Sequence, residues 1–281
     1  MPKERSVSKS EEADGQRRGA WLIAAYRPVT LFSLRMTHAT SKGGKTLVVP
    51  TPYSVKMALL DACFRCYSSA AALGWARKVF DCLKRREIQV RPPKHCVVNN
   101  TFIKVLDWSR EPVNGPFRNT IVYREFAFFG GDDLLIAIEA AGLTEEDQSV
   151  LEQLFAHINS LGKRGGFWQF VGSERVEGAL PFGFTVPRPE ATFEQIASYA
   201  LTQALDDFGE VLYAAADGFE RVSTYGSGTV RLGEQRILTA TAIPYRRRSA
   251  SRHFTWYERV QQPQVMLKDS SFGSSRGECN V

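Results

Sequence analysis

The sequence is poor in cysteine and histidine, and it contains no long run of apolar residues. Five of the 281 residues are cysteine and four are histidine. A small, odd number of cysteines in apolar surroundings is typical of free thiols in a reducing compartment. Without a long apolar run or a basic-then-apolar N-terminus, the sequence predicts neither a transmembrane helix nor a signal peptide. We therefore expect a cytoplasmic protein with no membrane partner.

The common signatures of catalysis and cofactor binding are missing as well. There is no Gly-x-Ser-x-Gly nucleophile elbow and no dinucleotide-binding glycine fingerprint. Residues 42–46 (KGGKT) end like a phosphate-binding P-loop, but the first glycine of that motif would fall at Ala39. An apolar run, residues 47–50, follows where a P-loop requires a helix. We reject ATP or GTP binding in this segment and expect no cofactor.

A metal site would have to be built from scattered cysteines. The candidate ligands are Cys63, Cys66, Cys82, His95 and Cys96. Structural zinc sites seat paired cysteines in tight turns, whereas Cys63 and Cys66 fall in a helical apolar stripe without turn residues. The sequence therefore favours no metal and no catalytic residue. A zinc module or an unrelated α+β enzyme is kept as a minor alternative.

What the sequence does contain is a segregated basic region. The net charge is +6, yet residues 42–94 hold 11 Lys and Arg against 3 Asp and Glu, while residues 95–244 hold 11 against 20. Such a region is the electrostatic footprint of a protein that binds a polyanion, although a solvated helix face can account for part of it. Nucleic acid is the natural candidate partner.

The chain divides by composition into four parts. Residues 1–18 are polar and predict disorder, whereas residues 19–176 alternate strands and helices in the manner of an α+β domain. Residues 177–245 form an accessory region with a predicted helix and short strands. Residues 246–281 contain three consecutive arginines and a Ser/Gly-rich end, which predicts a basic, partly disordered tail.

Local patterns place the elements within these parts. Thr51 fits a helix N-cap with Pro52 at the first helical position, and Thr144 fits a second N-cap before three acidic residues. The predicted helices span residues 52–66, 75–83, 145–161 and 192–208. The predicted strands up to the second half of the chain span residues 20–36, 87–91, 96–108, 119–129 and 133–140. A further strand is predicted to begin at residue 167, and three short ones span residues 220–224, 229–232 and 236–243. This order predicts a ferredoxin-like or RNA-recognition-motif domain with a C-terminal accessory β-containing region.

One turn carries the most informative chemistry. The helix from Thr144 is predicted to stop at Gly162, followed by Lys163 and Arg164 in a tight turn and then by an aromatic strand near Phe167. Glycines that accept positive φ let backbone amides face outward beside the two cations, which suits a phosphate chain. The alternative is that Gly162 ends the helix and the cations only complement the helix dipole.

Three segments in this order resemble landmarks of the fifth CRISPR-associated protein family. They are residues 49–52 (VPTP) before a small-residue helix, residues 118–127 (RNTIVYREFA) and residues 161–167 (LGKRGGF). Members of that family belong to the RAMP superfamily and cap the 5′ end of the guide RNA in type I Cascade complexes. The resemblance covers about residues 19–176.

What the resemblance implies is an RNA-recognition-motif domain that binds the 5′ handle of the CRISPR RNA, contacts the backbone and large subunits of Cascade, and meets target DNA indirectly. The residue chemistry fits, because cations contact phosphates and exposed aromatics stack on bases. The predicted RNA-binding residues are Lys42, Lys45, Tyr53, Lys163, Arg164 and Phe167. Each aromatic has the alternative of a core position, since alternate strand residues face inward.

Some members of the family also cut the precursor RNA, with a tyrosine just before the Val-Pro-Thr-Pro segment and a Lys-His pair around the second helix. Here Leu47 occupies the tyrosine position, and the second helix has no such pair. The resemblance therefore favours a non-catalytic subunit. The alternative is a metal-independent endoribonuclease, with His38 or His95 as general base and Lys42 or Lys94 stabilising the charged intermediate.

Overall fold

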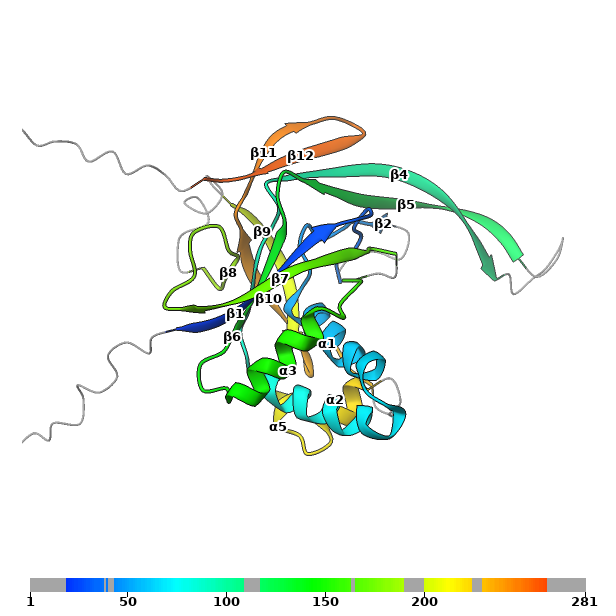
Figure 1. The fold of residues 1–281 in the computed structure, drawn as a ribbon. Helices are drawn as coiled ribbons and strands as arrows, with labels where there is room; N and C mark the ends of the chain where they lie inside the picture. Colours follow the sequence, from blue (N-terminus) through cyan, green and yellow to red (C-terminus); the bar gives the residue numbers. More distant parts are fainter. Residues whose placement is uncertain are drawn as a thin grey trace, which may run out of the picture.

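The computed structural model describes residues 19–37, 39, 43–108, 117–162, 165–189, 200–223 and 229–261. Within these ranges the chain is a mixed α+β protein with more strand than helix, built from three sheets and a layer of helices (Figure 1). The α+β class predicted from the sequence is thus confirmed. None of the helices in these ranges is both long and apolar enough to cross a membrane.

The central sheet is antiparallel throughout. Its strands lie in the order β3 (Ile88–Arg91), β6 (Leu134–Glu139), β1 (Ala20–Pro28) and β7 (Trp168–Glu177). Alternation along β1 sends Leu22 and Tyr26 into the main core, while Ile23 packs with Phe184 in a small cluster on the opposite face. Because both faces of β1 are covered, its sequence is almost continuously apolar.

Three helices cover one face of this sheet (Figure 1). They are α1 (Pro52–Cys66), α2 (Ser69–Leu83) and α3 (Glu145–Phe155). The predicted N-cap of α1 is confirmed, because the Thr51 hydroxyl accepts a hydrogen bond from the Ser54 amide (3.1 Å) and the Ser54 hydroxyl accepts one from the Thr51 amide (2.9 Å). Thr144 caps α3 in the same way, accepting from the Asp147 amide (3.1 Å).

The end of α3 differs from the prediction. The helix ends at Phe155 and not at Gly162, which lies in the connection to β7. The buried hydroxyl of Tyr26 donates to the Phe155 carbonyl oxygen (2.9 Å), so β1 holds the last turn of the helix in place. Ile158 and Leu161 have helical spacing but reach the core from this non-helical connection, which explains why periodicity overestimated the helix.

The second sheet carries a long projecting hairpin. Its strands lie in the order β11 (Tyr245–Ala250), β12 (Phe254–Arg259), β4 (His95–Trp108), β5 (Phe117–Gly130) and β2 (Gly43–Gly44). The predicted strands 96–108 and 119–129 are confirmed as β4 and β5. In Figure 1 their distal halves extend away from the rest of the molecule as a curved arm.

The third sheet lies against α1 and the end of α2. It contains β8 (Val186–Pro187), β10 (Arg236–Ile243) and β9 (Leu201–Phe208), with the short helices α5 (Glu210–Ala214) and α6 (Gly218–Val222) between β9 and β10. Within the predicted helix 192–208, residues 201–208 instead form β9, and residues 192–199 lie outside the described ranges. Residues 220–222 of a predicted strand are helical, and residues 229–232 form no regular strand, only a bridge at Leu232. Pairing of all eight residues of β9 with β10 outweighs the local helical tendency of the segment.

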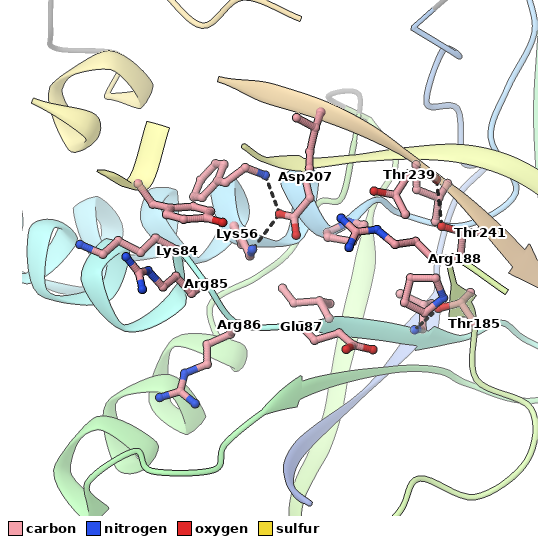
Figure 2. Close-up of a pocket in the computed structure, with 18 residues that line it drawn as sticks. Lys56, Lys84, Arg85, Arg86, Glu87, Thr185, Arg188, Asp207, Thr239 and Thr241 are labelled. Carbon is pink, nitrogen blue, oxygen red and sulfur yellow. Dashed lines mark hydrogen bonds and ion pairs between the residues drawn. The ribbon is translucent and has the colours of Figure 1, made fainter. Parts of the chain in front are cut away.

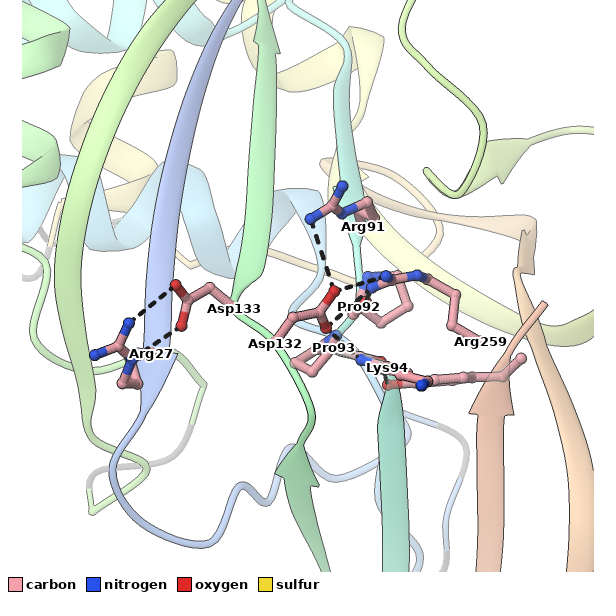
Figure 3. A network of polar contacts seen from close by, with 9 residues as sticks. Arg27, Arg91, Pro92, Pro93, Lys94, Asp132, Asp133 and Arg259 are labelled. Atoms are coloured by element: carbon pink, nitrogen blue, oxygen red, sulfur yellow. Dashed lines mark hydrogen bonds and ion pairs between the residues drawn. The ribbon is translucent and has the colours of Figure 1, made fainter. Parts of the chain in front are cut away.

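The predicted C-terminal tail was wrong over residues 246–259, where β11 pairs with β12 and β12 pairs with β4. Two contacts hold these strands. The Tyr245 hydroxyl donates to the Pro93 carbonyl oxygen (2.7 Å), and the Arg259 guanidinium meets the Asp132 carboxylate (2.6 Å), which also accepts from the Lys94 amide (2.5 Å). Figure 3 shows this network between β12 and the β5–β6 connection. Arginine-rich composition suggested a solvated tail, whereas the three consecutive arginines lie exposed on β11, the edge strand of this sheet.

Candidate nucleic-acid interface

A hollow of about 340 Å³ lies where the chain after β1 meets the base of the β4–β5 arm and the turn before β7. The residues that line it are Ser33, Leu34, Arg35, Gly44, Arg124 and Gly162. We call it the basic groove. Three segments far apart in the sequence meet here, so no local pattern could have predicted their grouping. A second hollow of about 370 Å³ is lined by Lys45 and Tyr123, from two of these segments, and by residues of β4, β9 and β12.

Backbone and side-chain hydrogen bonds fix these segments to one another. The Leu47 amide donates to the Leu34 carbonyl oxygen (2.8 Å), and the Met36 amide donates to the Lys45 carbonyl oxygen (3.0 Å). Across this ladder, the Thr46 amide donates to the Glu125 carboxylate (2.9 Å) on β5. The groove is therefore built on ordered strand-like backbone.

Glu125 is engaged on both oxygens, because the Tyr123 hydroxyl donates to the other one (2.9 Å). Burial, together with the Glu125 carboxylate, raises the pKa of Tyr123 to about 12, so the phenol keeps its proton. The neighbouring Arg124 donates to the Tyr123 carbonyl oxygen (2.9 Å) but has no carboxylate partner among the described residues.

Three cations at this place carry positive charge without a carboxylate in contact, counting only the described part of the chain. They are Arg35, Lys45 and Arg124. Elsewhere on the surface cations are often neutralised; Arg175, for example, contacts both Glu145 (2.5 Å) and Glu152 (2.7 Å). Unneutralised cations around a hollow are suited to phosphate groups.

The glycine turn predicted to bind phosphate borders the groove. Gly162 has φ 76° and Gly165 has φ 98°, conformations that favour glycine. A Cβ at Gly162 would lie 3.2 Å from Leu34 Cβ, so the turn packs closely on the groove wall. Thr30 holds the other end, donating to the Gly165 carbonyl oxygen (2.6 Å) and accepting from the Phe167 amide (2.8 Å).

The predicted RNA-binding residues fall into three groups. Lys45 lines the second hollow, and Phe167 is 48% exposed beside the glycine turn. Lys42, Lys163 and Arg164 lie outside the described residues. Tyr53 lines neither hollow; its half-buried ring packs on Phe208 (5.4 Å between centroids) and under the Arg236 guanidinium (4.4 Å). Burial raises the pKa of Tyr53.

The arm carries a feature that the sequence analysis missed. Paired residues on β4 and β5 place one row of large apolar side chains on the face that buries Val98 nearer the body. The exposed members of this row are Phe102, Leu106, Trp108, Phe117 and Ile121, each more than half exposed. The sequence pattern that could have predicted this row is the recurrence of apolar residues at even positions of β4. Exposed apolar rows of this kind mark interaction surfaces.

The alternative chemistry finds little support in the geometry. His95 begins β4 half-buried, with its ring 5.9 Å from that of Trp256, and His38 lies outside the described residues. Cys63 is buried within α1, where burial raises the pKa of its thiol to about 12. In the described ranges no three His, Cys, Asp or Glu side chains gather closely enough to hold a metal ion.

Comparison with known proteins identifies a protein of similar sequence. No family model matches the sequence. The chain is 26% identical over 132 residues to the CRISPR-associated protein Cas5 of Archaeoglobus fulgidus, a match covering 44% of this chain and 57% of that protein. The chain thus spans little more than half the length of this curated relative. A crystal structure of a CRISPR protein from the same organism has a TM-score of 0.44 and 12% identity, over 86% of this chain and 92% of that one. The resemblance expected from the sequence is confirmed: this chain is similar to the fifth family of CRISPR-associated proteins.

Proposed function

We propose that this protein is a CRISPR-associated subunit of a cytoplasmic Cascade ribonucleoprotein, in which it binds the 5′ handle of the guide CRISPR RNA. The single observation that carries the proposal is that Arg35 and Arg124 line the basic groove and Lys45 lines the second hollow, all three without carboxylate partners among the described residues. The similarity to Cas5 supplies the class of RNA. The role is structural, and RNA cleavage is not part of the proposal.

We also propose that the central sheet and its helices form a ferredoxin-like, RNA-recognition-motif domain. The support is topological. In chain order the elements are strand β1, helices α1 and α2, strands β3 and β6, helix α3 and strand β7, and the sheet order is β3-β6-β1-β7 with the helices on one face. The β4–β5 arm is an insertion between the second and third strands of this plan.

The basic groove would bind phosphates and leave bases accessible to neighbouring aromatics. Arginine forks and lysine ammonium groups contact phosphate oxygens, and glycine turns let backbone approach the chain closely. Phe167, exposed beside the glycine turn, offers a ring for base stacking. Single-stranded handle RNA suits this arrangement better than a duplex, whose bases are not available for stacking.

The arm would contact a neighbouring protein subunit. Its exposed apolar row is costly to leave in water, and burial against a partner removes that cost. A repeated backbone subunit that follows the guide RNA beyond the handle is the expected partner, with the large subunit contacting another face. Target DNA is met only through the RNA and these subunits.

Binding of the purified protein to its own CRISPR repeat RNA, measured against a scrambled RNA of equal length over a salt series, tests the proposal. Repeat RNA should bind more tightly. The logarithm of the association constant should decrease linearly with the logarithm of the salt concentration. For each phosphate contact removed, this line should become shallower, its slope decreasing in magnitude by about 0.7. Arg35→Ala/Arg124→Ala and Lys163→Ala/Arg164→Ala should each lower affinity and reduce the slope.

The matched control removes two exposed cations far from the groove that already have carboxylate partners. Arg65 pairs with Asp61 (2.9 Å) on α1, and Arg77 pairs with Glu220 (2.9 Å). Arg65→Ala/Arg77→Ala should leave RNA binding unchanged. Equal loss in the control and in Arg35→Ala/Arg124→Ala would refute a groove-specific site. Including EDTA and a labelled RNA in the same assay detects specific cleavage, which would replace this proposal with the endoribonuclease alternative.

A further inference from the structure

A third cavity lies between α1, the end of α2, the edge strand β3 and the third sheet (Figure 2). Its volume is about 340 Å³. That is more space than a free phosphate ion needs and falls near the lower end of pockets that hold small organic molecules, roughly 300–1,000 Å³. None of its lining residues lines the basic groove.

The charge of this cavity is strongly positive. Five cations line it against two carboxylates: Lys56, Lys84, Arg85, Arg86 and Arg188, with Glu87 and Asp207. Figure 2 shows Lys84, Arg85 and Arg86 at the α2 end and Arg188 on the β8 side. Cations thus approach the cavity from two separate elements, as they do in sites that hold a phosphate group.

Three of these cations already have partners within the protein. The Lys56 ammonium lies 2.7 Å from Asp207, Lys84 lies 2.6 Å from Asp81, and Arg86 donates to the carbonyl oxygens of Cys82 and Ala141. The other two have no carboxylate partner among the described residues. Arg85 rests on the ring of Tyr213 (5.2 Å to the centroid), and the Arg188 side chain makes no hydrogen bond or ion pair with any described residue.

Arg188 also has an unusual backbone. Its φ is 48°, and among the described residues it is the one non-glycine residue in the left-handed region. Its amide donates to the Ala240 carbonyl oxygen (2.9 Å), which anchors this conformation to β10. Left-handed backbone at an arginine is unfavourable, and such positions cluster where a side chain must be held in a particular direction.

The remaining wall is largely apolar. Ile88, Leu205, Phe208 and Ile237 contribute to it, and Thr239 and Thr241 add hydroxyl groups. A ligand that fits both parts has a phosphate for the guanidinium groups and a weakly polar body for the apolar wall. A nucleotide unit combines these two features at the size of the cavity.

We propose that this cavity is a binding site for a single phosphate-bearing nucleotide unit, with Arg188 and Arg85 as its phosphate contacts. The unit is a free mononucleotide; the 5′-phosphorylated terminus of an RNA is a competing outcome that the test below distinguishes. The site is independent of the basic groove and therefore of the proposed function. Its phosphate recognition uses side chains only, and residues 42–46, rejected as a P-loop, take no part.

Calorimetric titration of the full chain at low salt tests the site with five probes: 5′-AMP, adenosine, inorganic phosphate, triadenylate, and 5′-phosphorylated triadenylate. For a free mononucleotide, AMP binds about tenfold or more tightly than adenosine, since charge-assisted hydrogen bonds to phosphate are lost in the nucleoside. If only the 5′-phosphorylated triadenylate binds, the site takes an RNA terminus and the mononucleotide assignment is overturned. If neither phosphorylated nucleotide probe binds, the proposal is overturned. If inorganic phosphate binds as tightly as AMP, the nucleotide assignment is overturned.

Arg188→Gly separates binding from folding. Glycine adopts φ 48° without strain, so the variant keeps the melting temperature of the parent while losing the guanidinium. Affinity for the bound probe falls about tenfold or more in Arg188→Gly and in Arg85→Ala, and Arg65→Ala, outside the cavity, leaves it unchanged. Equal affinity in Arg188→Gly and the parent overturns the site. Repeat-RNA binding through the basic groove is expected to survive Arg188→Gly, so failure of either proposal is recognisable without the other.

Discussion

The Lys56 ammonium lies 2.7 Å from the Asp207 carboxylate, and the lysine side chain is 1% exposed. Lys56 is on α1 and Asp207 is on β9, so this ion pair joins the helical layer to the third sheet. The ammonium also lies 5.2 Å from the centre of the Phe208 ring. Burial lowers the pKa of Lys56, and the nearby Asp207 carboxylate opposes that change.

Breaking this pair should be costly. Asp207→Ala leaves a buried ammonium without its partner, so the free energy of unfolding should fall by about 3 kcal/mol. Urea denaturation measures the change. Asp61→Ala is the control, because the Asp61–Arg65 pair is exposed and removal of such pairs costs about 0–1 kcal/mol. Equal losses in the two variants would show that burial of Lys56 does not control the energy of the pair.

Tyr245 should anchor the β11–β12 hairpin through its hydroxyl. The side chain is 1% exposed and donates to the Pro93 carbonyl oxygen (2.7 Å). Tyr245→Phe keeps the ring but leaves the buried carbonyl unpaired, which should lower the free energy of unfolding by about 1–2 kcal/mol. Tyr257→Phe, in the neighbouring strand, removes a hydroxyl with no described hydrogen bond and should cost less. A larger loss at Tyr257 would contradict this assignment.

Acid should weaken the N-terminus of α3. Hydrogen bonding from Thr144, whose hydroxyl lies 2.8 Å from the Asp147 carboxylate, lowers the pKa of Asp147 below its ordinary value of 3.8. A lowered folded-state pKa means that this stabilisation is present above pH 3.8 and is lost as the pH falls through the folded-state value.

Stability of the parent and of Asp147→Asn, measured by denaturation from pH 6 to acid, checks this expectation. The difference between the two should be constant down to about pH 4 and then shrink. When Thr144→Ala is present in both proteins, the stability difference made by Asp147→Asn should vary less with pH. The reason is that the Thr144 hydrogen bond, the largest cause of the lowered Asp147 pKa, is absent. A difference that grows in acid would have the wrong sign.

The apolar row on the arm should contribute little to the stability of the isolated protein. Leu106 is 71% and Ile121 62% exposed, so Leu106→Gln/Ile121→Gln should change the free energy of unfolding by about 0.5 kcal/mol or less. Val98 is 6% exposed on the same face, and Val98→Ala should cost about 1–3 kcal/mol. Reduced self-association of the Gln variant in sedimentation would agree with an interaction surface. A large loss of stability would mean that the row packs against the protein itself.

Much of the local structure could be predicted because local chemistry determines it. Thr51 and Pro52 begin α1, and Thr144 begins α3, since a cap and its first turn involve only neighbouring residues. The strands of the arm follow from alternating and β-branched residues. The basic character of residues 42–94 also follows from composition alone.

Tertiary structure decided what local preference could not. Residues 201–208 became a strand because β10 offers a full ladder of partners, and residues 245–259 became two strands because β4 provides an edge. Arg35, Lys45 and Arg124 come from separate segments, which are brought together by the pairing of β2 with β5 and by the backbone hydrogen bonds of Met36 with Lys45 and of Leu47 with Leu34. Such contacts form between residues far apart in the sequence. The entropy lost in closing the loops between them, and the contact energy gained, cannot be inferred from any short segment alone. The sequence by itself determined the caps, most strands and the charge; the groove and the cavity exist only in the folded chain.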